Sequence, residues 1–145
     1  MPTHAETGCG YIRCGADRAD GSKAIAAVVE KPDAATAQRY LDSGEYLWNS
    51  GLFMMRASVW LAAIEICRGD ILAACVEAWE RGSIDGEFLR VDKEAFAQCP
   101  KDSIDYAVME RLAGGADTLP PGVVIPLSAG WSDVGAWDAL WAVSA

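Results

Sequence analysis

Four short segments of this 145-residue chain put polar groups where a strand ends or a loop turns, which is where α/β sheets place their ligands. In the first segment, Gly8 and Gly10 flank a single residue and Tyr11 follows. Glycines carry no Cβ, so backbone N–H and C=O groups there can approach a ligand closely. A tight turn leading into a hairpin explains the same residues equally well.

The second segment carries two opposite charges at the end of an apolar run of strand length. Glu30 and Lys31 follow residues 24–29, and Pro32 fixes the exit of the chain. A carboxylate suits sugar hydroxyls as a two-oxygen acceptor, and an ammonium group suits a phosphate. Charged residues at strand ends are more often simply solvated, so this pair is only a candidate.

The other two segments offer an amide, a hydroxyl and a carboxylate. Asn49 and Ser50 precede Gly51, and the asparagine amide can both donate to and accept from a sugar, although a β-turn is the competing interpretation. Asp133 lies in a loop that enters a predicted helix. A carboxylate there could hold Mg²⁺ together with substrate phosphates, or it could cap the helix.

The elements that must position these residues alternate between strands and helices, which predicts an α/β fold with one domain over residues 1–145. A β-hairpin is expected to turn at residues 17–21 and to end at residues 30–31. Asp33 and Gly44 are expected to cap the helix that follows it. A buried strand is expected at residues 52–55, and another strand at residues 123–127. Helices are expected at residues 34–42, 59–68 after the cap Ser58, 71–81, a short stretch after Asp92, and 134–143. Another helix is expected at residues 103–112, with Ser103 as its cap and Gly114 and Gly115 closing it.

Composition excludes several classes of function. The formal net charge is 12 − 21 = −9 and no run of lysines or arginines occurs, which excludes a nucleic-acid-binding surface. No apolar run approaches about 18 residues and the first 20 residues are polar, so neither a membrane span nor a signal peptide is expected. The five cysteines are irregularly spaced, as is typical of free thiols in a reducing cytoplasm.

Taken in order, five stretches resemble the bacterial mannose-1-phosphate guanylyltransferases, including the forms fused to a mannose-6-phosphate isomerase. They are PTHAETGCGYI, VVEKPD, YLWNSGLF, SIDYAVMER and GWSDVGAW, and they span residues 2–137. The resemblance implies the C-terminal, sugar-phosphate-binding portion of a nucleotidyltransferase domain. The implied fold is part of a Rossmann-like nucleotide-diphospho-sugar transferase, with a mixed sheet flanked by helices.

The same resemblance implies transfer of a guanylyl group from GTP to mannose 1-phosphate, giving GDP-mannose and pyrophosphate with Mg²⁺ as cofactor. Lys31 and Asp133 would be catalytic, with Lys31 at the sugar's phosphate and Asp133 as a metal ligand. The substrate-binding residues would be Gly8, Gly10, Tyr11, Glu30, Lys31, Asn49 and Ser50.

The sequence departs from the family pattern in two ways. Cys9 stands where the family usually has tyrosine, and the family's glycine-rich triphosphate loop has no counterpart in these 145 residues. We therefore expect the isolated chain to be catalytically inert, with GTP bound mostly through residues outside it. Sheet edges and an apolar face left open would favour self-association.

Two alternative functions remain open from the sequence. One is a non-catalytic sugar-phosphate-binding or regulatory module, and the other is a related nucleotidyltransferase that uses glucose 1-phosphate. Binding of mannose 1-phosphate would distinguish a competent acceptor site from an inert fragment.

Overall fold

A computed structural model describes residues 2–112, 121–132, 134–135 and 137–144. Its contacts divide the chain into two compact units, Met1–Phe53 with Gly122–Ala145, and Met54–Pro121. The α/β class expected from the sequence is confirmed. The expectation of one domain over the whole chain stays a prediction.

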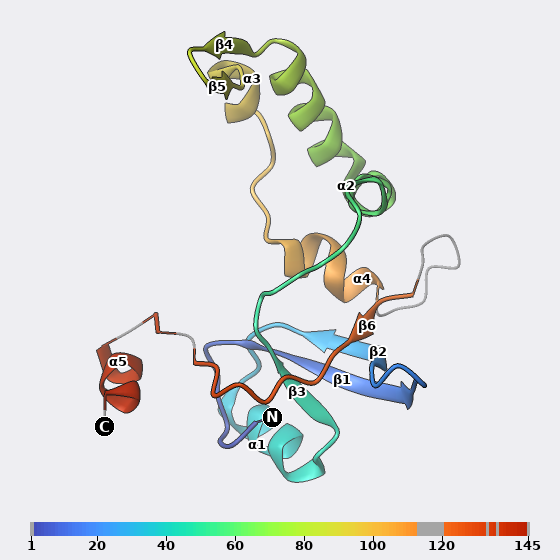
Figure 1. Cartoon of the computed structure of the whole chain (residues 1–145), viewed down its shortest axis with the longest axis vertical. Helices are drawn as coiled ribbons and strands as arrows, with labels where there is room; N and C mark the ends of the chain where they lie inside the picture. The colour runs from blue at the N-terminus through green and yellow to red at the C-terminus, as the bar shows by residue number, and fades with distance from the viewer. Residues whose placement is uncertain (1, 113–120, 133, 136, 145) are drawn as a thin grey trace. The chain divides into compact units, whose positions relative to one another are not determined.

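The first unit is built on a four-stranded sheet in the order β3-β1-β2-β6 (Figure 1). β1 (Gly10–Asp17) lies between β2 (Lys23–Val29) and β3 (Tyr46–Asn49), and the short β6 (Val123–Val124) pairs with the outer side of β2. The pairings of these strands are antiparallel. Two neighbours therefore hold the start of β1 from both sides.

The predicted hairpin of β1 and β2 is confirmed. Its turn is closed by a hydrogen bond from the N–H of Arg18 to the carbonyl of Ser22 at 2.9 Å, and Gly21 supplies a left-handed φ of 84°. Asp20 Oδ1 also accepts from the N–H of Ser22 at 3.0 Å, which is ordinary chemistry for an aspartate in a turn. The pairing delivers the end of β2 beside the beginning of β1.

Helix α1 (Ala34–Ser43) has the caps that the sequence predicts. Asp33 Oδ1 accepts from the N–H of Thr36 at 2.8 Å, and Gly44 ends the helix at a φ of 67°. Tyr40 stacks on Tyr46 of β3 with ring centroids 3.9 Å apart. These contacts fasten the helix to the sheet.

The prediction of a buried strand at residues 52–55 is wrong. The strand lies just before it, in β3, because residues 46–49 are the ones that pair with β1. Gly51, with a φ of 69°, turns the chain after the strand, and Leu52 and Met54 are 72% and 99% exposed. An apolar run of four residues does not show whether it pairs with a neighbour.

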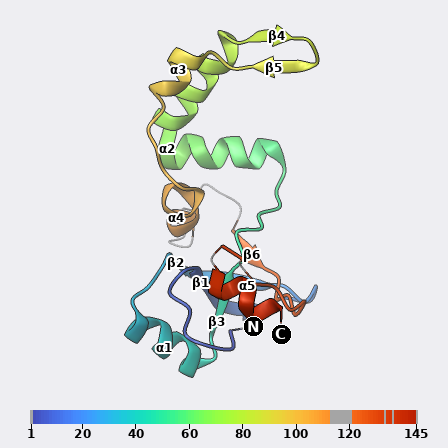
Figure 2. The same ribbon diagram turned by 90° about the vertical axis from the view of Figure 1, so that its left-hand side faces the viewer.

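The second unit contains the long helix α2 (Ala57–Glu80), which bends sharply in Figure 2. Arg68 departs from helical geometry at φ −148° and ψ 63°, so the two helices predicted here are two arms joined at a kink. Arg68 is paired with Asp70 at 2.9 Å and with Asp102. The predicted cap at Ser58 is wrong, because the helix begins at Ala57, directly after Arg56, and Ser58 lies in its first turn.

Small side chains form the core of the second unit. The buried cluster of Ala63, Cys67, Ala107 and Val108 joins the first arm of α2 to the π-helical turn η1 (Asp105–Met109). Ser103 Oγ accepts from the N–H of Tyr106 at 3.3 Å, which confirms the predicted cap before this segment. The helix continues as α4 (Glu110–Leu112), and its expected end at residues 114–115 lies outside the described residues.

The remaining elements are short. β4 (Ser83–Asp85) and β5 (Phe88–Arg90) form a hairpin with exposed side chains, and α3 (Lys93–Ala97) follows Asp92 as predicted. The strand expected at 123–127 is limited to β6, and α5 (Trp137–Val143) begins later than the predicted residue 134. The five cysteines, which all lie in the described ranges, form no disulfide. Within the described part of the chain, no helix has the length and apolarity required to span a membrane.

The left-handed ending of α1 at Gly44 can be tested by substitution. Gly44→Ala should lower the free energy of unfolding by about 1 kcal/mol, because a residue with a Cβ is strained at the left-handed φ. Gly69→Ala is the control: it lies within α2 without a left-handed φ, and alanine favours a helix. Urea unfolding followed by circular dichroism measures both, and equal effects of the two changes would contradict the assignment.

Candidate functional site

Three residues predicted from separate segments meet at one end of the first unit's sheet. Gly10 opens β1 and pairs directly with Asn49 at the end of β3. Glu30 follows Val29, the partner of Tyr11, so it lies across from Gly10 on the other side. A Cβ on Gly10 would overlap Glu30 Oε2 and lie 3.3 Å from Asn49 Cβ. The missing side chain of Gly10 therefore makes room for the carboxylate.

Glu30 and Lys31 form an ion pair with Nζ and Oε1 3.4 Å apart. The glutamate side chain is 10% exposed and the lysine side chain is 60% exposed, so the ammonium group remains accessible to an anion from solvent. Lys31 has a φ of 44°, and no other non-glycine residue in the described ranges has a positive φ. Such backbone strain is typical of functional sites.

Asn49 and Ser50 shape the opposite side of this end of the sheet. Asn49 is 9% exposed, and its Oδ1 accepts from the N–H of Gly51 at 3.0 Å. The bond ties the asparagine to the left-handed turn that ends β3. Ser50 is partly buried within that turn. The amide group of Asn49 is thus held in place by the local backbone.

The segment before β1 is organised by Glu6, which the sequence reasoning did not select. Its Oε1 accepts from the N–H of Gly8 at 2.6 Å, and its Oε2 lies 3.3 Å from His4 Nε2. These bonds, that of Gly8 above all, hold the pKa of the Glu6 carboxyl below its usual range. The sequence signal that could have identified Glu6 is a carboxylate two residues before a glycine in a loop. That pattern is common in turns.

Tyr11 contributes to the site through its support of that segment. Its side chain is fully buried, and its ring packs against Tyr40 and Tyr46 at centroid distances of 5.4 and 6.5 Å. The hydroxyl accepts from the N–H of Glu6 at 2.9 Å. Of the residues predicted to bind substrate, Tyr11 is therefore the one whose side chain belongs to the core.

Asp133, the predicted catalytic residue and metal ligand, lies outside the described residues. In the described ranges, no group of three or more histidine, cysteine, aspartate or glutamate side chains could hold a metal ion. The assignment of Asp133 stays a prediction.

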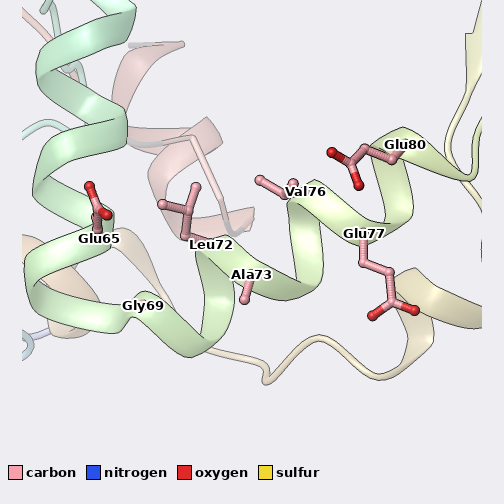
Figure 3. A pocket seen from close by; sticks show the side chains of 7 residues that line it. All are labelled: Glu65, Gly69, Leu72, Ala73, Val76, Glu77 and Glu80. Atoms are coloured by element: carbon pink, nitrogen blue, oxygen red, sulfur yellow. The ribbon is translucent and has the colours of Figure 1, made fainter.

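A separate hollow of about 480 Å³ lies along α2 in the second unit. Figure 3 shows Gly69 at the bend of the helix and carboxylates on both sides of it. Three glutamates, Glu65, Glu77 and Glu80, line the hollow together with aliphatic side chains, and no described lysine or arginine lines it. A sugar phosphate would be repelled by this lining.

Comparison with known proteins agrees with this assignment of the fold. A profile described as "Nucleotidyl transferase" matches residues 1–145. The chain belongs to the nucleotidyl transferase family. The similarity to mannose-1-phosphate guanylyltransferases that the sequence motifs predicted is also confirmed.

Two relatives of this nucleotidyl transferase chain carry informative names. The xanthan biosynthesis protein XanB of Xanthomonas campestris pv. campestris (strain B100) is 53% identical over 143 residues, which cover 99% of this chain and 29% of the relative. The mannose-1-phosphate guanylyltransferase RfbM of Salmonella typhimurium is 50% identical over 144 residues, with the same coverage. The chain thus spans under a third of the length of these relatives.

A solved structure supports the fold of this nucleotidyl transferase chain. It is described as a mannose-1-phosphate geranyltransferase from Thermus thermophilus and is 33% identical, with a TM-score of 0.73. The match covers 99% of this chain and 38% of that one.

The space beside Gly10 can be tested by a double substitution. Gly10→Ala should lower the free energy of unfolding by about 1–3 kcal/mol, since the new methyl group collides with the Glu30 carboxylate. In a Glu30→Ala background the same change should cost less, because that carboxylate is gone. Denaturant unfolding of the four proteins measures the coupling, and purely additive costs would show that the two residues do not share this space.

The lowered pKa of Glu6 predicts a pH dependence of stability. Because the folded-state pKa lies below the ordinary value of 4.5, folding favours the carboxylate. The contribution is fully present above pH 4.5 and is lost as the pH falls through the folded-state pKa. The stability difference between the natural protein and Glu6→Gln should accordingly shrink below about pH 4.5 in unfolding experiments. A difference that stays constant from about pH 7 to pH 3 would contradict this.

Proposed function

We propose that this chain is the acceptor-binding part of a mannose-1-phosphate guanylyltransferase. The whole protein would transfer a guanylyl group from GTP to mannose 1-phosphate, giving GDP-mannose and pyrophosphate for polysaccharide biosynthesis. The proposal rests on one observation: Gly10, Glu30 and Asn49 meet at one end of the sheet, with Lys31 beside them. The names of the relatives, which include a mannose-1-phosphate guanylyltransferase and a xanthan biosynthesis protein, support the choice of reaction.

The hydroxyl groups of the sugar would be recognised by a carboxylate, an amide and a hydroxyl side chain. The largely buried carboxylate of Glu30 can accept from two hydroxyl groups, and Asn49 with Ser50 can contact the ring from the other side. The absent Cβ of Gly10 leaves room for the Glu30 carboxylate, which the ring would meet at this position. The arrangement suits a polyhydroxylated ring better than a flat apolar ligand.

The phosphate of the sugar would be bound by Lys31. At an effective dielectric constant near 20, an ammonium group about 4 Å from a phosphate charge gains on the order of 4 kcal/mol before desolvation is subtracted. The chain carries a net charge of −9, so attraction of an anion must come from such a local cation. The accessibility of the Lys31 side chain is consistent with this role.

In the proposed reaction, a phosphate oxygen of mannose 1-phosphate attacks the α-phosphorus of GTP. One P–O bond forms, the bond to the β-phosphate breaks, and pyrophosphate leaves. Lys31 would hold the attacking phosphate and offset the repulsion between two anions. Mg²⁺ would neutralise the triphosphate when bound, and Asp133 is its proposed ligand in this chain.

GTP would be bound mostly by residues outside these 145. The sequence contains no glycine-rich loop that could offer a triphosphate several backbone N–H groups. The chain by itself should therefore bind mannose 1-phosphate and release no pyrophosphate when GTP is added. Turnover at the level of a full-length enzyme would overturn this division of roles.

Lys31 tests the proposed acceptor site directly. Lys31→Ala should weaken binding of mannose 1-phosphate by roughly 10- to 100-fold, the loss expected for one charge-assisted hydrogen bond. Titration calorimetry on the 145-residue chain measures the affinity. Lys23→Ala is the matched control, because Lys23 is in the same unit but is paired with Asp17. Equal affinity of both variants would contradict the assignment of Lys31.

A further inference from the structure

A small network centred on Glu6 connects the segment before β1 to Tyr11 of β1 and to Trp48 of β3. We infer that Glu6 is a positioning residue that fixes the Gly8–Gly10 loop for sugar binding, acting through hydrogen bonds to the loop and through His4. The inference rests on the proposed function for its effect on the sugar. Its structural part, the ordering of the loop, stands separately.

The first half of the network joins Glu6 to the loop and to β1. The two oxygens of its carboxylate are divided between Gly8 N–H at 2.6 Å and His4 Nε2 at 3.3 Å. The N–H of Glu6 donates to the buried Tyr11 hydroxyl at 2.9 Å. A Cβ on Gly8 would lie only 3.1 Å from Glu6 Oε1, so the carboxylate sits directly against the loop backbone.

The second half of the network reaches β3. The His4 ring meets the Trp48 ring edge-on, with centroids 4.9 Å apart, and Trp48 immediately precedes Asn49. Trp48 Nε1 is buried without an acceptor in the part of the chain that the structure describes. The orientation of this indole therefore depends on packing contacts, of which His4 supplies one. Glu6 thus links the loop before β1 to the strand that carries the site's asparagine.

Order in this loop matters because two of its residues are glycines. Glycine loses more conformational freedom on ordering than any other residue, so a loop that is ordered only on binding lowers the affinity for the ligand. A carboxylate that orders the loop beforehand removes that cost without touching the sugar. Glu6 is suited to this role because the bond that its carboxylate accepts from Gly8 involves neither Glu30 nor Lys31.

The test compares Glu6→Ala with Glu6→Gln, whose amide oxygen can still accept from Gly8 N–H. Amide hydrogen exchange at Gly8, followed by NMR, reports the order of the loop, and calorimetry reports the affinity for mannose 1-phosphate. Glu6→Ala should lose the protection of Gly8 and weaken binding by about tenfold. Glu6→Gln should restore most of both. Glu45→Ala, which removes an exposed carboxylate paired with Arg13 in the same unit, should change neither.

Each result decides a separate part of the inference. Unchanged exchange at Gly8 in Glu6→Ala would overturn the ordering role, and faster exchange with unchanged affinity would overturn the effect on the sugar. If the natural chain does not bind mannose 1-phosphate, the proposed function fails, while exchange at Gly8 still tests the ordering role. If Glu6→Ala does not fold, His4→Ala replaces it at an exposed position. That variant should weaken binding in the same direction, and unchanged affinity would count against the inference.

Discussion

The candidate site depends on the pairing of β1 with strands on both of its sides. That register places Gly10 between Glu30 and Asn49, three residues that are far apart in the sequence. Because neighbours in a strand point to opposite faces, it also sends Tyr11 to the other face, into the aromatic cluster with Tyr40 and Tyr46. One hydrogen-bonding pattern thus places the candidate site on one face of the sheet and the aromatic cluster on the other.

The two strands beside β1 end with the same backbone conformation but with different residues. Both exits use a left-handed φ, 69° at Gly51 after β3 and 44° at Lys31 after β2. Glycine adopts that conformation without a steric cost, whereas lysine does not. Such backbone strain is typical of functional sites, and here the lysine lies beside the carboxylate of Glu30. The backbone strain and the charge pair support the same assignment.

For the binding of a phosphorylated sugar, the local charge at the site matters more than the net charge of the chain. The net charge of −9 would repel a phosphorylated sugar, and the hollow along α2 is lined by three glutamates. The end of the first unit's sheet instead combines an accessible cation with a carboxylate and an amide that suit hydroxyl groups. The two units therefore offer surfaces of different chemistry.

The sequence by itself determined the features that depend on neighbouring residues. The caps of α1 at Asp33 and Gly44, the hairpin turn near Gly21 and the break in α2 follow from local backbone preferences, and the family follows from the order of its motifs. Only the tertiary structure decided which short apolar run pairs with β1, because pairing depends on a distant partner. For the same reason it alone revealed that Tyr11 is buried and that Glu6 holds the loop.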